Sequence, residues 1–125
     1  MLDSSAPDSV GGAFLGRGHS VILHREVLPD GTHDHIVCAT ALANNAILVA
    51  VDADMKRLAQ RYGSAPQHAR FKELHLIRIG CNGPMARARV EQAMDLIESE
   101  WAFACDKAAR RMWIDICNHY IKTHR

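Results

Sequence analysis

The sequence predicts an α/β fold of three layers, in which a central, mostly parallel sheet lies between helices and ends in a C-terminal antiparallel hairpin. Residues 46–51, Ala-Ile-Leu-Val-Ala-Val, form a continuous apolar run without alternation. Such a run is typical of a strand buried on both faces. Helical and strand patterns also alternate along most of the chain, which favours a parallel sheet with helices on both of its faces.

The elements before this strand are indicated by turn residues and by the spacing of apolar residues. Pro7 suits a first helical turn and Gly18 suits the position after a last one. The turn signature Pro-Asp-Gly-Thr precedes a second helix, which Thr32 or His33 could cap. The expected elements are a helix over residues 8–18, a strand over residues 19–23 and a helix over residues 34–44.

The elements after this strand follow from the same signals. The pattern predicts a helix over residues 55–62, a strand over residues 74–79 and a long amphipathic helix over residues 85–105. Two alternating runs, residues 111–116 and 119–124, are separated by Cys117-Asn118, which fits a hairpin.

Length and composition predict a single globular domain over residues 1–125. The chain is 48% hydrophobic and 23% charged, which excludes a disordered or collagen-like polymer. Its apolar runs are shorter than a membrane-spanning helix needs, and its start lacks the pattern of a signal peptide, so we expect a cytoplasmic protein without a membrane partner. Its four cysteines form no C-x-x-C pair, which argues against a zinc ribbon or a redox motif and favours reduced thiols.

Charge is distributed unevenly along the chain although the net charge is only +1. Residues 1–54 hold seven acids against two arginines, whereas residues 55–90 hold eight basic residues against one acid. A metal-dependent enzyme acting on a phosphate polymer needs carboxylates for the cation and basic residues for the backbone. Scattered, solvated surface charge would give the same numbers, so this observation leaves both interpretations open.

Acidic residues stand at positions where a parallel sheet places its ligands, beyond the carboxyl ends of its strands. Asp52 ends the apolar run and Asp54 comes two residues later, Asp3 ends a very short first strand, and Asp34 opens a helix at the same end of the sheet. Four converging carboxylates would repel one another without a cation, and an all-oxygen ligand set suits Mg²⁺ or Mn²⁺. An Asp at a helix start is also a common N-cap, which is the alternative interpretation of Asp34.

Other chemistries find less support in the sequence. His33-Asp34-His35 could hold a transition metal, but residues two apart on a helix do not face one another. The chain has no G-x-S-x-G elbow, Walker A loop or Rossmann fingerprint, which removes serine hydrolases and common nucleotide-binding folds. Trp101, Phe103 and Trp113 fit a core or a dimer interface better than a platform for stacked bases.

The set of motifs resembles a known family over nearly the whole chain. Its members are PIN-like domains of unknown function related to VapC-type toxin ribonucleases. The stretches that carry the resemblance are Asp3 to Val10, Arg17 to Ile22, Arg25 to Pro29, Asp34 with Ile36-Val37, Ile47 to Asp54, and His68 to Lys72.

The resemblance implies a PIN-like fold and a Mg²⁺- or Mn²⁺-dependent endoribonuclease, often paired with an antitoxin. It places the catalytic and metal-binding acids at Asp3, Asp34, Asp52 and Asp54. The basic residues after these acids are our candidates for RNA contacts, namely Arg57, Arg61, Arg70 and Lys72. The alternative is a catalytically inactive PIN-like module that binds RNA or another partner, and an apolar C-terminal hairpin would suit a homodimer.

Overall fold

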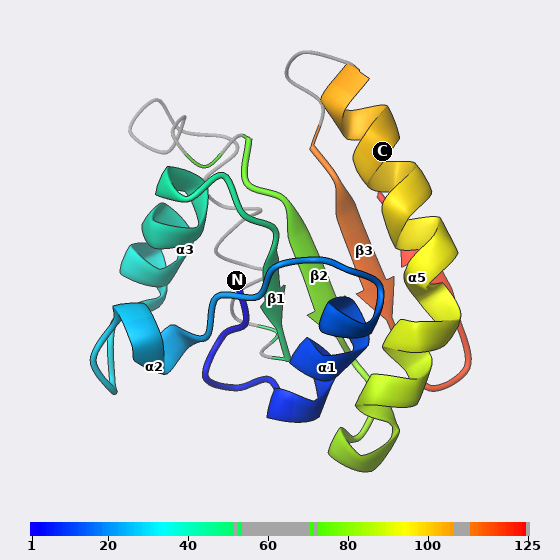
Figure 1. Ribbon diagram of the computed structural model, residues 1–125, viewed down its shortest axis with the longest axis horizontal. Helices are drawn as coiled ribbons and strands as arrows, with labels where there is room; N and C mark the ends of the chain where they lie inside the picture. The colour runs from blue at the N-terminus through cyan, green and yellow to red at the C-terminus, as the bar shows by residue number, and fades with distance from the viewer. Residues whose placement is uncertain (52, 54–70, 72, 107–110, 125) are drawn as a thin grey trace.

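The computed structural model describes residues 1–51, 53, 71, 73–106 and 111–124. Its elements follow one another as an α/β protein, which confirms the predicted class (Figure 1). The helices are α1 (Asp8–Gly16), α2 (His24–Val27), α3 (Asp34–Ala43) and α5 (Gly83–Asp106). The strands are β1 (Leu48–Ala50), β2 (Leu76–Ile79), β3 (Trp113–Ile116) and β4 (Ile121–Thr123).

The strands form an open mixed sheet in the order β1-β2-β3-β4. β1 and β3 both run parallel to β2, and β4 pairs antiparallel with β3. Beyond β1, the chain start extends the sheet through isolated parallel bridges that join Leu2 to Val49 and Leu2 to Leu23. The segment around Leu2 therefore lies between β1 and the segment around Leu23.

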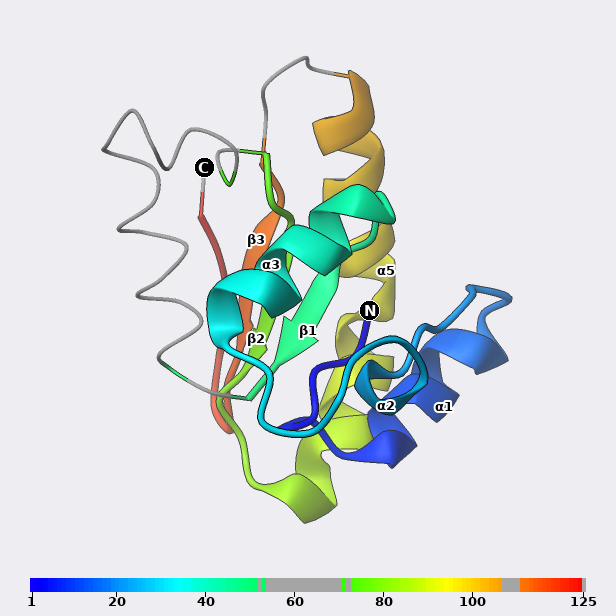
Figure 2. The ribbon, with the colours of Figure 1, turned by 90° about the vertical axis from the view of Figure 1, so that its left-hand side faces the viewer.

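Helices cover both faces of the sheet. α1 and α5 lie on one face, where Val10 and Val90 pack with Ile77 and Ile114 of the strands (Figures 1 and 2). α3 lies on the opposite face, where its buried residues pack with Leu48, Leu76 and Trp113. Neighbouring strand residues such as Leu76 and Ile77 belong to different cores because successive side chains of a strand point to opposite faces.

The structure corrects two expectations about the first third of the chain. The strand expected over residues 19–23 is reduced to a single bridge at Leu23, preceded by Gly18 with a left-handed φ of 85°. The short helix α2 follows directly and was not predicted, because its four residues are too few to show a helical period. The helix expected over residues 55–62 falls outside the described residues.

α5 is the longest described helix, with 24 residues. Val90, Met94 and Ile97 lie on its buried face, whereas Arg87 and Glu91 form an exposed ion pair one turn apart. In the part of the chain that the structure describes, no helix is long and apolar enough to cross a membrane.

His75 connects the start of β2 to two other parts of the core. Its Nδ1 accepts a hydrogen bond of 2.9 Å from the main-chain nitrogen of Met112. Its ring meets the ring of Trp101 edge-on, with 4.8 Å between centroids. Burial lowers the pKa of His75, while the charge of Glu73 acts in the opposite direction. The folded protein therefore favours the neutral imidazole.

We expect acid to destabilise the protein partly through His75. The unfolded chain takes up a proton near pH ~6.5 that the folded chain resists, so the free energy of unfolding falls as the pH drops through that value. His75→Asn keeps an acceptor for Met112 but cannot be protonated, and it should flatten the change between about pH 7.5 and 5.5 in urea unfolding. His119→Asn, at an exposed position, is the control and should keep the wild-type slope. An unaltered slope in His75→Asn would contradict this expectation.

Candidate functional site

The strand order of the sheet reverses next to Leu2. From the segment around Leu2, the chain passes through α1 to the bridge at Leu23 on one side, and the later strands β1, β2 and β3 lie on the other side. In an open parallel sheet, such a reversal leaves a crevice beyond the carboxyl ends of the two strands that flank it. Asp3 is the residue that follows Leu2 at this edge.

Asp3 is held firmly at the reversal point. Its main-chain nitrogen donates to the carbonyl of Val49 at 2.9 Å, and its residue exposure is only 7%. Its Oδ2 accepts hydrogen bonds from the hydroxyl of Ser5 at 2.5 Å and from the main-chain nitrogen of Ser5 at 3.1 Å. The Ser5 hydroxyl oxygen in turn accepts from the main-chain nitrogen of Val51 at 3.2 Å. The carboxylate is thereby fixed to the end of β1.

Ser5 is the residue of this site that sequence reasoning missed. An Asp followed two residues later by a residue that donates to its side chain is the local pattern of an Asx-turn. That signal is present in Asp3-Ser4-Ser5, but the second contact, from Val51 to the hydroxyl of Ser5, depends on β1 lying beside the chain start.

Asp34 is the first residue of α3, and its side chain is partly exposed. A carboxylate in a first helical turn is favoured by the helix dipole. The cap residue is His33, without a hydrogen bond from its side chain. The strands β1, β2 and β3 point toward the end of the molecule at which α3 begins (Figure 1). Asp34 therefore lies at the same end of the sheet as Asp3.

A buried thiol lies within the electrostatic influence of both carboxylates. Cys38 lies one turn after Asp34 on α3 and is 1% exposed. Burial raises the pKa of Cys38 to about 12, with further contributions from the negative charges of Asp34 and then Asp3. Charges act on a buried group in this way only from nearby. Asp3 and Asp34 thus come from different elements, and both charges act on the same buried thiol.

The other predicted residues lie outside the described residues. These are Asp52 and Asp54 of the D-x-D motif and the candidate RNA contacts Arg57, Arg61, Arg70 and Lys72. β1 ends at Ala50, so Asp52 follows the end of this strand by two positions in the sequence. Among the described residues alone, no group of three or more His, Cys, Asp or Glu is placed to hold a metal ion.

Three arginines of the basic stretch are described, and all three contact the protein itself. Arg78 lies 3.5 Å from Asp115, Arg87 pairs with Glu91, and Arg89 donates to the carbonyl of Cys117 at 3.0 Å. The charge argument for a phosphate backbone therefore depends on the basic residues between positions 56 and 72.

Three histidines also lie near this end of the sheet, two as a stacked pair and one buried. The rings of His33 and His35 stack with 5.8 Å between centroids and 14° between their planes. His24 follows the bridge at Leu23, is 5% exposed, and its main-chain nitrogen donates to the carbonyl of Leu2 at 3.0 Å. Its Nδ1 has no hydrogen-bond partner among the described atoms. Neither arrangement belongs to a metal-binding group of three within the described ranges.

Comparisons with protein-family models, with curated proteins and with solved structures return no match for this chain.

The Ser5 hydroxyl should contribute measurably to stability because it bonds a buried carboxylate. We expect Ser5→Ala to lower the free energy of unfolding by about 1.5–3 kcal/mol at neutral pH, the range for hydrogen bonds to charged groups. Urea unfolding measures the change. Ser4→Ala, at the exposed neighbouring position, should stay within about 0.5 kcal/mol of wild type. Equal effects of the two substitutions would argue against the Asp3–Ser5–Val51 connection.

Proposed function

We propose that this chain is a PIN-like, metal-dependent endoribonuclease that cleaves RNA phosphodiesters. The observation that supports the proposal is the position of Asp3, a buried carboxylate at the reversal point of the sheet, at the same end of the sheet as the start of α3 with Asp34. Carboxylates brought close together repel one another, and a cation between them relieves that repulsion. Carboxylate oxygens are the ligands that Mg²⁺ and Mn²⁺ prefer in proteins. The proposal includes the three-layer PIN-like arrangement and the C-terminal hairpin.

In this proposal Asp3, Asp34, Asp52 and Asp54 hold one or two Mg²⁺ or Mn²⁺ ions. Such ions activate a water molecule and neutralise charge that develops on a phosphodiester. Asp3 supplies a carboxylate whose position is fixed by Ser5, and Asp34 supplies one from the start of α3. Arg57, Arg61, Arg70 and Lys72 bind the RNA backbone through its phosphates. No covalent nucleophile is needed.

The direct test is cleavage of a mixed panel of single-stranded RNAs in the presence of Mg²⁺ or Mn²⁺. We expect cleavage by the wild type, none with EDTA, and a loss of at least about 100-fold, or ~3 kcal/mol of transition-state stabilisation, in Asp3→Asn and Asp52→Asn. Asp30→Asn is the matched control, because Asp30 is an exposed acid in a turn, and it should cleave at the wild-type rate.

A folded wild type that cleaves none of the RNAs would overturn the nuclease proposal. Retained RNA binding in that experiment would support the alternative, a catalytically inactive RNA-binding or interaction module. Equal losses in Asp30→Asn and Asp3→Asn would also contradict the proposed assignment of the acids.

Metal binding can be measured without any substrate. A ligand that binds only the folded protein stabilises it by about 2.7 kcal/mol at 100 times its dissociation constant. We therefore expect Mn²⁺ to raise the melting temperature of the wild type in a thermal shift assay. Asp52→Asn and Asp34→Asn should abolish most of the shift, whereas Asp30→Asn should retain it. A shift of the same size in all four proteins would place the ion elsewhere.

A further inference from the structure

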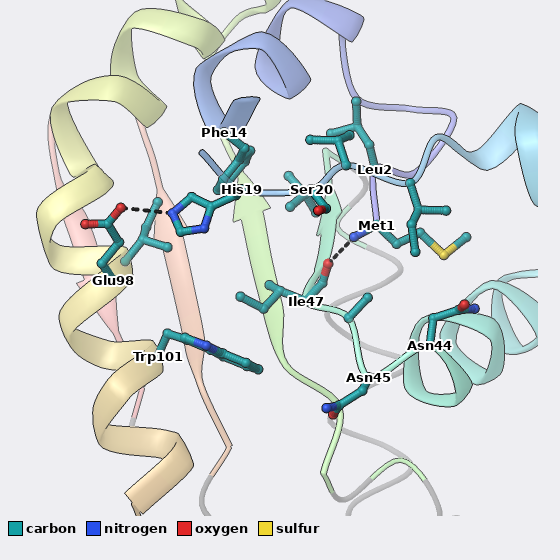
Figure 3. A pocket seen from close by; sticks show the side chains of 15 residues that line it. Met1, Leu2, Phe14, His19, Ser20, Asn44, Asn45, Ile47, Glu98 and Trp101 are labelled. Carbon is teal, nitrogen blue, oxygen red and sulfur yellow. Dashed lines mark hydrogen bonds and ion pairs between the residues drawn. The ribbon is translucent and has the colours of Figure 1, made fainter. Parts of the chain in front are cut away.

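A separate pocket of about 300 Å³ lies at the amino ends of the strands, opposite the end that holds Asp3 and Asp34. Its walls include Trp101 of α5, Phe14 of α1, Leu2, and Asn45 to Ile47, which immediately precede β1 (Figure 3). This volume is at the lower end of the range for small-molecule sites. An α-helix, about 10–12 Å across with its side chains, is too wide for it.

The pocket exists because α1 and α5 differ in length. α1 has nine residues and α5 has 24, and the two helices pack against each other over the first half of α5. A Cβ at Gly12 in the middle of α1 would lie 2.9 Å from Arg87, near the start of α5. Arg17, just after α1, reaches only as far as Asp95 and Glu98. Trp101 lies beyond the end of α1.

The indole of Trp101 forms one wall of the pocket, and a residue outside the pocket holds its orientation. Its ring meets His75 edge-on at an interplanar angle of 80°, and His75 is itself held by the main-chain nitrogen of Met112. The side chain is only partly buried although it belongs to the apolar face of α5. Figure 3 shows the indole extending from α5 across the pocket toward Ile47.

One wall of the pocket includes Glu98 and His19, which belong to a cluster of charged groups. Glu98 accepts a hydrogen bond from Arg17 at 2.6 Å and contacts Nε2 of His19 at 2.9 Å. Arg17 also donates to Asp95 at 2.9 Å. The hydrogen bond with His19, followed by that with Arg17, lowers the pKa of Glu98. Two carboxylates thus share one guanidinium beside the pocket.

Another wall of the pocket is formed by the turn between α3 and β1. Asn45 adopts a left-handed φ of 50°, which Asn tolerates better than most residues. This conformation allows the chain to leave α3 and enter β1 at once, and the amide group of Asn45 borders the pocket (Figure 3). The pocket therefore combines a mostly apolar lining with polar groups from different elements, the usual composition of a ligand site.

We propose that this pocket binds a small aromatic molecule that carries an uncharged hydrogen-bond donor, such as a carboxamide. The ring would lie against Trp101 and Ile47, and the donor would face Glu98 or the carbonyl group of Asn45. Aromatic rings gain from packing against an indole beyond the area that they bury. An anionic group is disfavoured because it would face the carboxylate of Glu98. This site is independent of the proposed nuclease site.

The test is a titration of the ¹⁵N-labelled full chain with benzamide, followed by two-dimensional NMR. We expect saturable shifts of the Trp101 indole NH and of the Ser20 and Ala46 amides, with a dissociation constant in about the millimolar range. Cyclohexanecarboxamide, which keeps the amide but lacks the aromatic ring, and benzoate, which replaces the amide by a charge, should each bind at least about threefold more weakly.

Two variants locate the binding. Ala46→Phe fills the pocket and should weaken benzamide binding by at least about tenfold. Ala88→Phe makes the same change at an exposed position near the start of α5, and it should leave the affinity unchanged. If Ala46→Phe disturbs the fold, Trp101→Leu serves in its place and should give the same loss. The proposal is wrong if benzamide causes no saturable shifts, if either comparison compound binds equally well, or if the pocket variants bind like wild type.

Discussion

The insertion of Leu2 between β1 and Leu23 is the constraint on which the rest of the structure depends. The main-chain nitrogen of Leu2 donates to Ile22, and its carbonyl accepts from His24. On the other side, Val49 donates to the carbonyl of Met1 and Asp3 donates to the carbonyl of Val49. These four bonds of 2.8–3.0 Å satisfy backbone groups that would otherwise be buried without partners.

The same inserted segment contributes residues to both ends of the sheet. At the carboxyl ends of the strands it places Asp3 beside the end of β1. There the Ser5 hydroxyl connects Asp3 of the chain start to Val51 after β1. At the amino ends, the side chain of Leu2 lines the apolar pocket between α5 and the start of β1. One buried segment therefore supports an acidic edge and an apolar pocket that face away from each other.

Much of the fold could be predicted because the strongest signals in the sequence are local. The apolar run before Asp52 predicts the strand that the structure contains as β1. The spacing of Val90, Met94 and Ile97 predicts the helix α5. The strand expected over residues 19–23 was wrong because an apolar run also fits a segment that pairs at only one residue. The placement of Asp3 and Asp34 at the same end of the sheet could be anticipated from their positions after a strand and at a helix start. The roles of Asp52 and Asp54 stay a prediction.

The features that the sequence does not reveal depend on contacts between distant segments. The pocket requires α1 to end before Trp101 and requires His75 to hold the indole ring, and neither follows from a sequence pattern. The link from Ser5 to Val51 joins residues 46 positions apart.

The contact of Arg17 with α5 is sensitive to dissolved ions. Arg17 is 44% exposed, and its partners Glu98 and Asp95 are 34% and 90% exposed. Attraction between such solvated groups weakens as the screening length falls from about 8 Å in physiological salt to about 3 Å in molar salt. The apolar contacts on the floor of the pocket are not weakened by this screening. Ionic strength would therefore change how strongly the end of α1 is held to α5, while the apolar packing beneath this contact is kept.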